Sequence, residues 1–255
     1  LVNNKKATVI IQARTQSTRL PNKVLALINH KPLIWYIIER LKSCERVEQI
    51  ILATSNREED KKLIEIANDC KILSFVGDEK DVLSRFYQAA LKFNADPIIR
   101  ITGDCPLVDP YLLDKMLGFY LENGYDFVSN TIIPTYPDGL DIEIFSFKSL
   151  RKTFNEAKLK SEKEHVTPYI WKNPGIFQLY NYRNKEELSN YRWTVDEQLD
   201  LELIRQIYSN FKPKIIFSFQ DVIEMGKLNP QIFKINEKIN RNEGYLKSIK
   251  EDDKK

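Results

Sequence analysis

Short apolar runs alternate with helix-like patterns along the first half of the chain. The run Ala7–Ala13 is uncharged and rich in β-branched residues, which is typical of a buried strand. From Pro32 onward, apolar residues recur at helical spacing as far as Leu41. The alternation continues, with strands predicted over 49–54, 71–76, 97–102 and 126–129 and helices over 60–70, 81–93 and 110–121. Strand and helix in strict rotation predict a mostly parallel sheet with helices on both faces.

The pattern changes in the second half of the chain. Polar and apolar residues alternate over Asp141–Phe145, as in a half-exposed strand. No Pro/Gly/Ser-rich linker interrupts the chain, so we expect one α/β domain with a doubly wound sheet and a small β-rich lobe. The remaining predicted elements are strands over 177–182 and 191–195, a helix over 197–211 and a charged, frayed tail over 245–255.

Composition narrows the class of protein. The 255 residues carry 39 Lys plus Arg against 36 Asp plus Glu, and this near balance gives no concentrated basic face for a nucleic-acid partner. No apolar run approaches the roughly 20 residues that a membrane span requires, and Leu1–Lys6 is polar with no signal-peptide core behind it. The three scattered cysteines argue against a disulfide framework or a CxxC metal site. We therefore expect a cytoplasmic protein with no membrane partner.

The loop after the first predicted strand concentrates positive charge. Arg14, Arg19 and Lys23 lie there with Ser17, and no acidic residue is interleaved. Ligands bind at the carboxyl ends of strands in open α/β sheets, and arginine forks, lysine and backbone N–H groups suit a polyphosphate. The alternative is a solvated basic loop. Neither the GxGxxG nor the GxxxxGK[ST] fingerprint is present.

Two acidic residues follow predicted strands. Asp104 comes after the strand at 97–102, and Asp196 comes after the strand at 191–195. Asp104 would face the same crevice as the cationic loop if the strand order reverses between the first and fourth strands. A carboxylate beside bound phosphates implies a hard cation such as Mg²⁺. Taken singly, each aspartate is better explained by a turn or a helix N-cap, and only the two together beside the cationic loop favour a metal site.

Two further clusters lie in the second half. Asp141 and Glu143 share one strand face, with Asp138 in the turn before them, and Glu164 precedes His165. Carboxylates on a strand face are usually solvated, and a lone histidine is more often structural than catalytic. We nevertheless expect these residues to contact the substrate, because the chain resembles a known family of proteins.

Four ordered motifs carry that resemblance. They are Ala13-Arg14-x-x-Ser17-x-Arg19-Leu20-Pro21-x-Lys23, Thr102–Leu107, Asp138–Glu143 and Trp193–Asp196. Over roughly residues 7–240 the chain resembles the sugar cytidylyltransferases, which activate acylneuraminate and 3-deoxy-manno-octulosonate as CMP-sugars. It is most similar to their spore coat polysaccharide biosynthesis subgroup, which Gly77–Arg85 and Glu164–Thr167 also resemble.

The resemblance implies a Rossmann-like nucleotidyltransferase fold, Mg²⁺ as cofactor, CTP as nucleotide substrate, a small sugar-type acceptor and a homodimer. The implied activity transfers CMP to a sugar acid or related sugar, for cell-surface polysaccharide or glycan biosynthesis. The expected single domain spans 1–244, with a nucleotide-binding half at about 7–130, a substrate and dimerisation lobe at about 131–195 and closing helices at 197–244.

The resemblance also implies residue roles. Arg14, Ser17, Arg19 and Lys23 would hold the triphosphate, and Asp104 and Asp196 would hold Mg²⁺. Arg14, Lys23 and the two aspartates would be the catalytic set. Residues expected near the nucleotide are Thr54, Asp78, Asp81, Arg85 and Thr102. Expected acceptor contacts are Asp138, Asp141, Glu143, Glu164, His165 and Arg192.

The chain departs from the relatives at two places, and two other functions remain open. Gln12 stands where sialic acid relatives often have proline, and Asn22 replaces a common glycine, which is tolerable because Asn accepts a left-handed conformation. A nucleotide-sugar glycosyltransferase also sets a carboxylate at a strand end. A non-catalytic nucleotide-binding regulatory protein would bind CTP without turnover.

Overall fold

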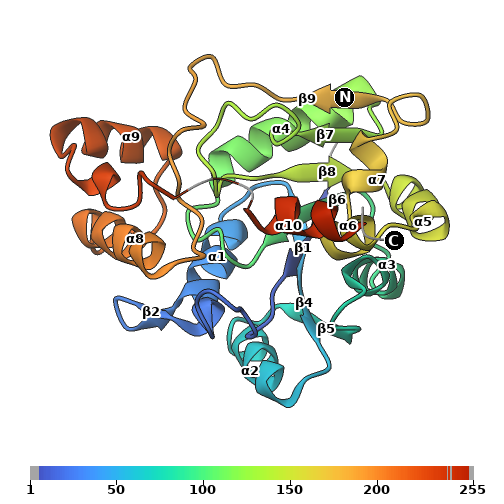
Figure 1. Ribbon diagram of the computed structural model, residues 1–255, viewed down its shortest axis with the longest axis horizontal. Helices are drawn as coiled ribbons and strands as arrows, with labels where there is room; N and C mark the ends of the chain where they lie inside the picture. The colour runs from blue at the N-terminus through green and yellow to red at the C-terminus, as the bar shows by residue number, and fades with distance from the viewer. Residues whose placement is uncertain (1–5, 240, 242, 253–255) are drawn as a thin grey trace.

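A seven-stranded sheet forms the centre of the computed structural model, which describes residues 6–239, 241 and 243–252 (Figure 1). The strand order is β5-β4-β1-β6-β8-β7-β9, and β8 alone among these strands runs against its neighbours. The strands are β1 (Ala7–Gln12), β4 (Val47–Ser55), β5 (Leu73–Gly77), β6 (Ile98–Thr102), β7 (Phe127–Ser129), β8 (Glu143–Phe145) and β9 (Leu179–Asn181). The predicted mostly parallel α/β sheet is confirmed.

Helices cover both faces of the sheet because successive strand residues point to opposite sides. In β1, Val9 and Ile11 pack in one buried cluster, and Ile10 packs in the other. The first cluster lies under α1 (Leu33–Lys42), α2 (Lys61–Asp69), α4 (Pro110–Asn123), α8 (Gln198–Phe211) and α9 (Phe219–Leu228). The second lies under α3 (Val82–Lys92), α5 (Phe147–Glu156) and α7 (Pro168–Trp171). Figure 1 shows α8 and α9 on one side of the sheet and α3 and α5 on the other.

The strand order reverses beside β1. The chain passes from β1 to β4 and β5 on one side and then returns to place β6 on the other. The reversal between the first and fourth predicted strands, on which the placement of Asp104 depends, is therefore present. The carboxyl ends of β1 and β6 flank the switch point at which ligands bind in open α/β sheets.

In the second half of the chain, the structure differs from the predicted elements at several places. Strands β8 and β9 extend the central sheet, whereas the strand expected over 191–195 is absent. Only Arg192 of that segment forms a bridge, to Asp138, and the N–H of Val195 donates to the carbonyl of Asp104 at 2.8 Å. The segment bonds to two separate loops, so no ladder forms.

Residues 245–252, expected to belong to a charged tail, instead lie in helix α10 (Glu243–Asp252). This helix packs against α6 (Lys160–His165). The remaining short elements are β2 (Leu27–Ile28), β3 (Lys31–Pro32), η1 (Lys23–Leu25), η2 (Glu58–Asp60) and η3 (Ile232–Lys234).

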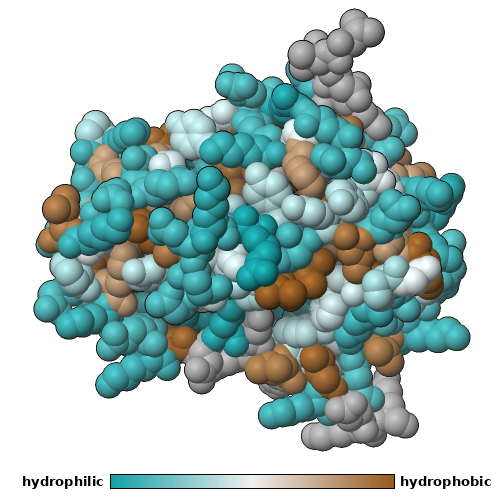
Figure 2. Space-filling view, turned by 90° about the horizontal axis from the view of Figure 1, so that it is seen from above, coloured by the Kyte–Doolittle hydropathy of each residue, from teal (hydrophilic) through white to brown (hydrophobic). Residues whose placement is uncertain are grey.

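The surface matches the composition. Figure 2 shows a mostly hydrophilic face on which hydrophobic side chains form small patches. Within the described part of the chain, no helix combines the length and apolar character needed to cross a membrane.

Candidate active site

The ammonium group of Lys23 lies between the carboxylates of Asp104 and Asp196. Its Nζ is 2.8 Å from Oδ2 of Asp104 and 2.6 Å from Oδ1 of Asp196. Burial favours neutral lysine, but the two carboxylates outweigh it and raise the pKa of Lys23. Burial also opposes the charge of Asp104, yet Lys23 and a hydrogen bond from Thr102 lower the pKa of Asp104 to about 2. These three groups, distant in sequence, form two ion pairs at the switch point.

A close contact between β1 and the end of β6 places Asp104. The N–H of Gly103 donates to the carbonyl of Gln12 at 2.8 Å. A Cβ at Gly103 would lie 2.7 Å from the Cβ of Ala13, which is closer than real Cβ contacts allow. Glycine is therefore required for the two strand ends to approach this closely, and the next residue points its carboxylate at Lys23.

Guanidinium groups surround the second acid of the site. Arg19 lies 2.8 Å and Arg192 3.2 Å from Oδ2 of Asp196. The N–H groups of Asp196 and Glu197 both donate to Asp200 at 2.9 Å, so the fully buried Asp200 fixes the start of α8. Sequence reasoning missed Asp200, although its place in the first turn of a predicted helix was a usable signal.

The two aspartates fit a hard cation. Their oxygens converge on one positive charge, and Mg²⁺ typically takes one or two carboxylates together with phosphate oxygens. Among residues 6–239, 241 and 243–252, no group of three or more His, Cys, Asp or Glu side chains is arranged to hold a metal ion. Asp104 and Asp196 would therefore hold Mg²⁺ in combination with a bound triphosphate.

A buried carboxylate anchors the cationic loop. Oδ1 of Asp60 accepts from the N–H and the hydroxyl of Thr15, both at 2.7 Å. Its Oδ2 accepts from the hydroxyl of Ser55 at 2.5 Å and from the N–H of Ser55 at 3.3 Å. Burial opposes the charge, but the hydrogen bonds from Ser55 and Thr15 hold the pKa of Asp60 below its ordinary value. Sequence reasoning missed Asp60, which lies in an acidic run that reads as solvated surface.

Local hydrogen bonds shape the same loop. Oγ of Ser17 accepts from the N–H of Leu20 at 3.4 Å, and the N–H of Asn22 donates to the carbonyl of Thr15 at 3.0 Å. Asn22 has φ of 58°, so the left-handed conformation expected at this position is confirmed. The turn brings Lys23 back towards the strand ends.

The residues expected near the nucleotide come from several elements: Thr54 lies at the end of β4, Asp78 follows β5, Asp81 and Arg85 lie at the start of α3, and Thr102 ends β6. Arg14 donates to the carbonyl of Glu79 at 3.4 Å, and Arg85 donates to the carbonyl of Asp78 at 2.9 Å. Burial and the nearby charge of Arg14 lower the pKa of Arg85 to about 10. Asp81 caps α3 through the N–H of Ser84. The structure therefore brings Arg14 and Arg85 close to each other.

Asp78, which belongs to the same expected group, has local partners. The carboxylate of Asp78 accepts from the N–H groups of Lys80 and Asp81, as in a turn. Thr54 is fully buried at the end of β4.

The expected acceptor contacts form two linked groups. In the first, Arg192 lies 3.2 Å from Asp138 and 3.0 Å from Asp200. In the second, Glu143 pairs with Arg100 and accepts from the hydroxyl of Thr167 at 2.7 Å. Asp138 and Asp141 lie within electrostatic range of Asp104. The structure therefore brings the first group beside the Lys23 site.

Glu164 and His165 lie further along, under the C-terminal helix. The hydroxyl of Ser248 lies 3.0 Å from Nε2 of His165 and donates to Glu164 at 3.0 Å. Burial and the charge of Arg100 lower the pKa of His165 to about 4. The imidazole is therefore neutral at pH 7.

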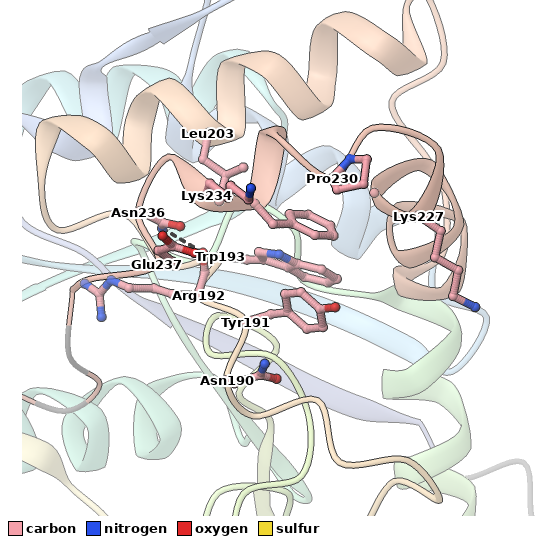
Figure 3. A pocket seen from close by; sticks show the side chains of 12 residues that line it. Asn190, Tyr191, Arg192, Trp193, Leu203, Lys227, Pro230, Lys234, Asn236 and Glu237 are labelled. Atoms are coloured by element: carbon pink, nitrogen blue, oxygen red, sulfur yellow. Dashed lines mark hydrogen bonds between the residues drawn. The ribbon is translucent and has the colours of Figure 1, made fainter.

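A cavity of about 320 Å³ lies behind the Trp193–Asp196 motif (Figure 3). Tyr191, Arg192 and Trp193 line one part of it, and Trp193 is fully buried. Nδ2 of Asn236 lies 2.9 Å from the carbonyl of Arg192 and 2.8 Å from Oδ1 of Asp200. Asn236 therefore supports the backbone that carries Asp196.

Known proteins of one family match this chain. Residues 8–239 match the sequence profile of the family described as "Cytidylyltransferase". The chain is 39% identical to an uncharacterized protein, MJ1063, of Methanocaldococcus jannaschii over 90% of this chain and 94% of that protein. It is 31% identical to the spore coat polysaccharide biosynthesis protein SpsF of Bacillus subtilis over 87% of this chain and 94% of SpsF. The solved structure of a cytidylyltransferase from Leptospira borgpetersenii superposes with a TM-score of 0.87 at 35% identity, covering 93% of this chain and 100% of that one.

Proposed function

The chain belongs to the cytidylyltransferase family, and from this premise we propose that it transfers CMP from CTP to a hydroxyl of a sugar acid or related sugar, with Mg²⁺ as cofactor. Family membership makes the chain a nucleotidyltransferase, which separates it from glycosyltransferases that share the strand-end carboxylate. The similarity to SpsF supports a role in making a cell-surface polysaccharide or glycan.

One observation carries the proposal. The carboxylates of Asp104 and Asp196, from opposite halves of the chain, converge on Lys23 at the topological switch point, with Arg19 bound to the same Asp196. A capping or turn role accounts for each aspartate alone, but it does not account for their convergence. Two hard ligands facing a set of cations are what an enzyme needs to bind a metal–triphosphate.

The chemistry follows from this charge distribution. The oxygen of an acceptor hydroxyl attacks the α-phosphorus of CTP, the bond to the bridging oxygen of the β-phosphate breaks, pyrophosphate leaves, and the hydroxyl proton is released to water. Arg14, Arg19 and Lys23 would bind the departing pyrophosphate and neutralise its growing charge. Mg²⁺ held by Asp104 and Asp196 would supply a positive charge to the α-phosphate. The protein's own contribution is positioning and electrostatic stabilisation.

The test is pyrophosphate release by the full chain. We expect release with CTP, an acceptor and MgCl₂, using 3-deoxy-manno-octulosonate, N-acetylneuraminate and sugar phosphates as acceptors and the other three nucleoside triphosphates as comparisons. Release should stop when EDTA replaces MgCl₂. Binding of CTP with no magnesium-dependent release from any acceptor would overturn the proposal in favour of a regulatory nucleotide-binding protein.

The first prediction concerns Asp104. Asp104→Asn should lower turnover by at least about 100-fold, because a neutral amide is a poor ligand for Mg²⁺ and no longer balances Lys23. Asp69→Asn, at an exposed position at the end of α2, is the matched control and should behave as wild type. Wild-type turnover in Asp104→Asn would remove this carboxylate from the mechanism.

A further inference from the structure

Arg241 and helix α10 (Glu243–Asp252) lie beside several of the expected acceptor residues. The family match ends at residue 239, so this segment lies outside it. Helix α10 packs on α6 (Figure 1), and Ser248 contacts both Glu164 and His165. The ring of Tyr245 meets the imidazole of His165 edge-on, with 5.1 Å between the ring centroids. The segment is therefore joined to the acceptor side of the molecule by specific contacts.

Arg241 reaches the two acids nearest the Lys23 site. Its Nη2 donates to Oδ1 of Asp141 at 3.0 Å, and its Nη1 donates to the carbonyl of Tyr136 at 3.2 Å. Its Nε lies 3.7 Å from Oδ1 of Asp138, too far for a hydrogen bond, and this buried nitrogen has no hydrogen-bond partner among the described residues. The guanidinium group thus lies between two carboxylates and keeps one N–H unused.

The two acids need this positive charge. Burial and the nearby charge of Asp141 raise the pKa of Asp138 to about 7, although Arg241 and Arg192 act in the opposite direction. Burial likewise raises the pKa of Asp141, and Arg241 again acts in the opposite direction. Without Arg241, the two neighbouring carboxylates would keep only the charge of Arg192 on the Asp138 side, so the protonated forms of both acids would be favoured further.

We propose that Arg241 is a positioning residue of the acceptor site, which orients the carboxylate of Asp141 and places its positive charge beside Asp138, so that both groups can accept hydrogen bonds from the acceptor. This inference rests on the proposed function. Carboxylates only accept hydrogen bonds, so the part of the acceptor that faces them carries donors such as hydroxyl groups. The anionic group of a sugar acid would lie elsewhere, because two aspartates would repel it.

The kinetic test compares Arg241→Gln and Arg241→Lys with wild type in the pyrophosphate assay. The acceptor is 3-deoxy-manno-octulosonate or N-acetylneuraminate, whichever the wild type uses. Arg241→Gln should raise the KM for the acceptor roughly 10-fold and leave the KM for CTP within about twofold, as expected for loss of one charged contact. Arg241→Lys should recover part of the loss. Arg205→Gln is the matched control, because Arg205 in α8 donates to the carbonyl of Leu27 instead.

A second measurement separates this inference from the proposed function. Carboxyl groups are labelled with a carbodiimide and glycine ethyl ester, and mass spectrometry quantifies the labelling without any turnover. Arg241→Gln should increase labelling of Asp138 and Asp141 several-fold, with Asp81 unchanged. Unchanged labelling would overturn the inference whether or not the enzyme is active. An equal rise in both KM values would also overturn it. If labelling increases in Arg241→Gln but the wild type releases no pyrophosphate, the result counts against the proposed function alone.

Discussion

Replacing Asp60 with asparagine should destabilise the fold and disturb the conformation of the cationic loop. Asp60 is fully buried, and its two oxygens accept four hydrogen bonds, two from Thr15 and two from Ser55. An amide has only one oxygen, so its NH₂ group must face one backbone N–H and one hydroxyl. The hydroxyl can rotate to accept, but the backbone N–H is left without a partner.

The magnitude follows from these contacts. Losing a hydrogen bond to a charged group costs about 1.5–3 kcal/mol, and an unsatisfied buried donor adds about 1–3 kcal/mol. Asp60→Asn should therefore lower the free energy of unfolding by about 3–5 kcal/mol. Thr15 anchors the turn between Arg14 and Lys23 through its hydrogen bonds to Asp60. The KM for CTP should therefore rise as well, and it should rise more than the KM for the acceptor.

Urea unfolding followed by tryptophan fluorescence measures the first effect, and the pyrophosphate assay measures the second. Glu59→Gln is the matched control, because Glu59 precedes Asp60 and is 63% exposed. A loss of stability below about 1 kcal/mol together with an unchanged KM for CTP would refute the reasoning. Such a result would mean that the loop keeps its shape without the carboxylate.

Two other predictions test a histidine and an arginine inside the fold. His165 has a pKa lowered to about 4 by burial and by Arg100, against an ordinary value of 6.5, so the unfolded chain binds its proton first as the pH falls. The free energy of unfolding should drop between about pH 6.5 and pH 4 by up to about 3 kcal/mol. Over that range, the urea midpoint of His165→Gln should change less with pH than that of the wild type. Parallel curves for the two proteins would contradict this. Arg40 is 1% exposed and donates at 2.7 Å to the carbonyls of Val108, Ile215 and Phe217. Arg40→Met should therefore lower the unfolding free energy by about 3–5 kcal/mol in urea titrations, and a loss under about 1 kcal/mol would show that the carbonyls find other donors.

The sheet and the position of the site could be predicted because both depend on local pattern and on a general rule of topology. Buried parallel strands read as uncharged β-branched runs, and their carboxyl ends meet at one edge. The Arg14–Lys23 loop follows such a run, and Asp104 follows an isoleucine-rich run in which Arg100 is the one charged residue, so their proximity depends on strand order alone. The strand order itself is not encoded locally. In the structure, the chain returns from β5 to place β6 on the other side of β1.

The C-terminal contacts could not be predicted because nothing local encodes them. Helix α10 has ten residues, a length at which an isolated helix is marginal, and its packing against α6 stabilises it. Its charged sequence therefore reads as a frayed end. Arg241 and Asp141 are separated by 100 positions, and Ser248 and Glu164 by 84. A residue's own type and neighbours do not specify a partner at that distance.

Arg192 illustrates the same limit in the centre of the site. The resemblance implies a substrate contact, yet its guanidinium lies within 3.2 Å of Asp138 and Asp196 and 3.0 Å of Asp200. Three carboxylates this close would repel one another and take up protons without a shared cation. Asp138 lies on the expected acceptor side, and Asp196 lies on the expected metal side. Arg192 therefore joins acids from both sides through ion pairs in one place, and this structural role precedes any contact it makes with a substrate.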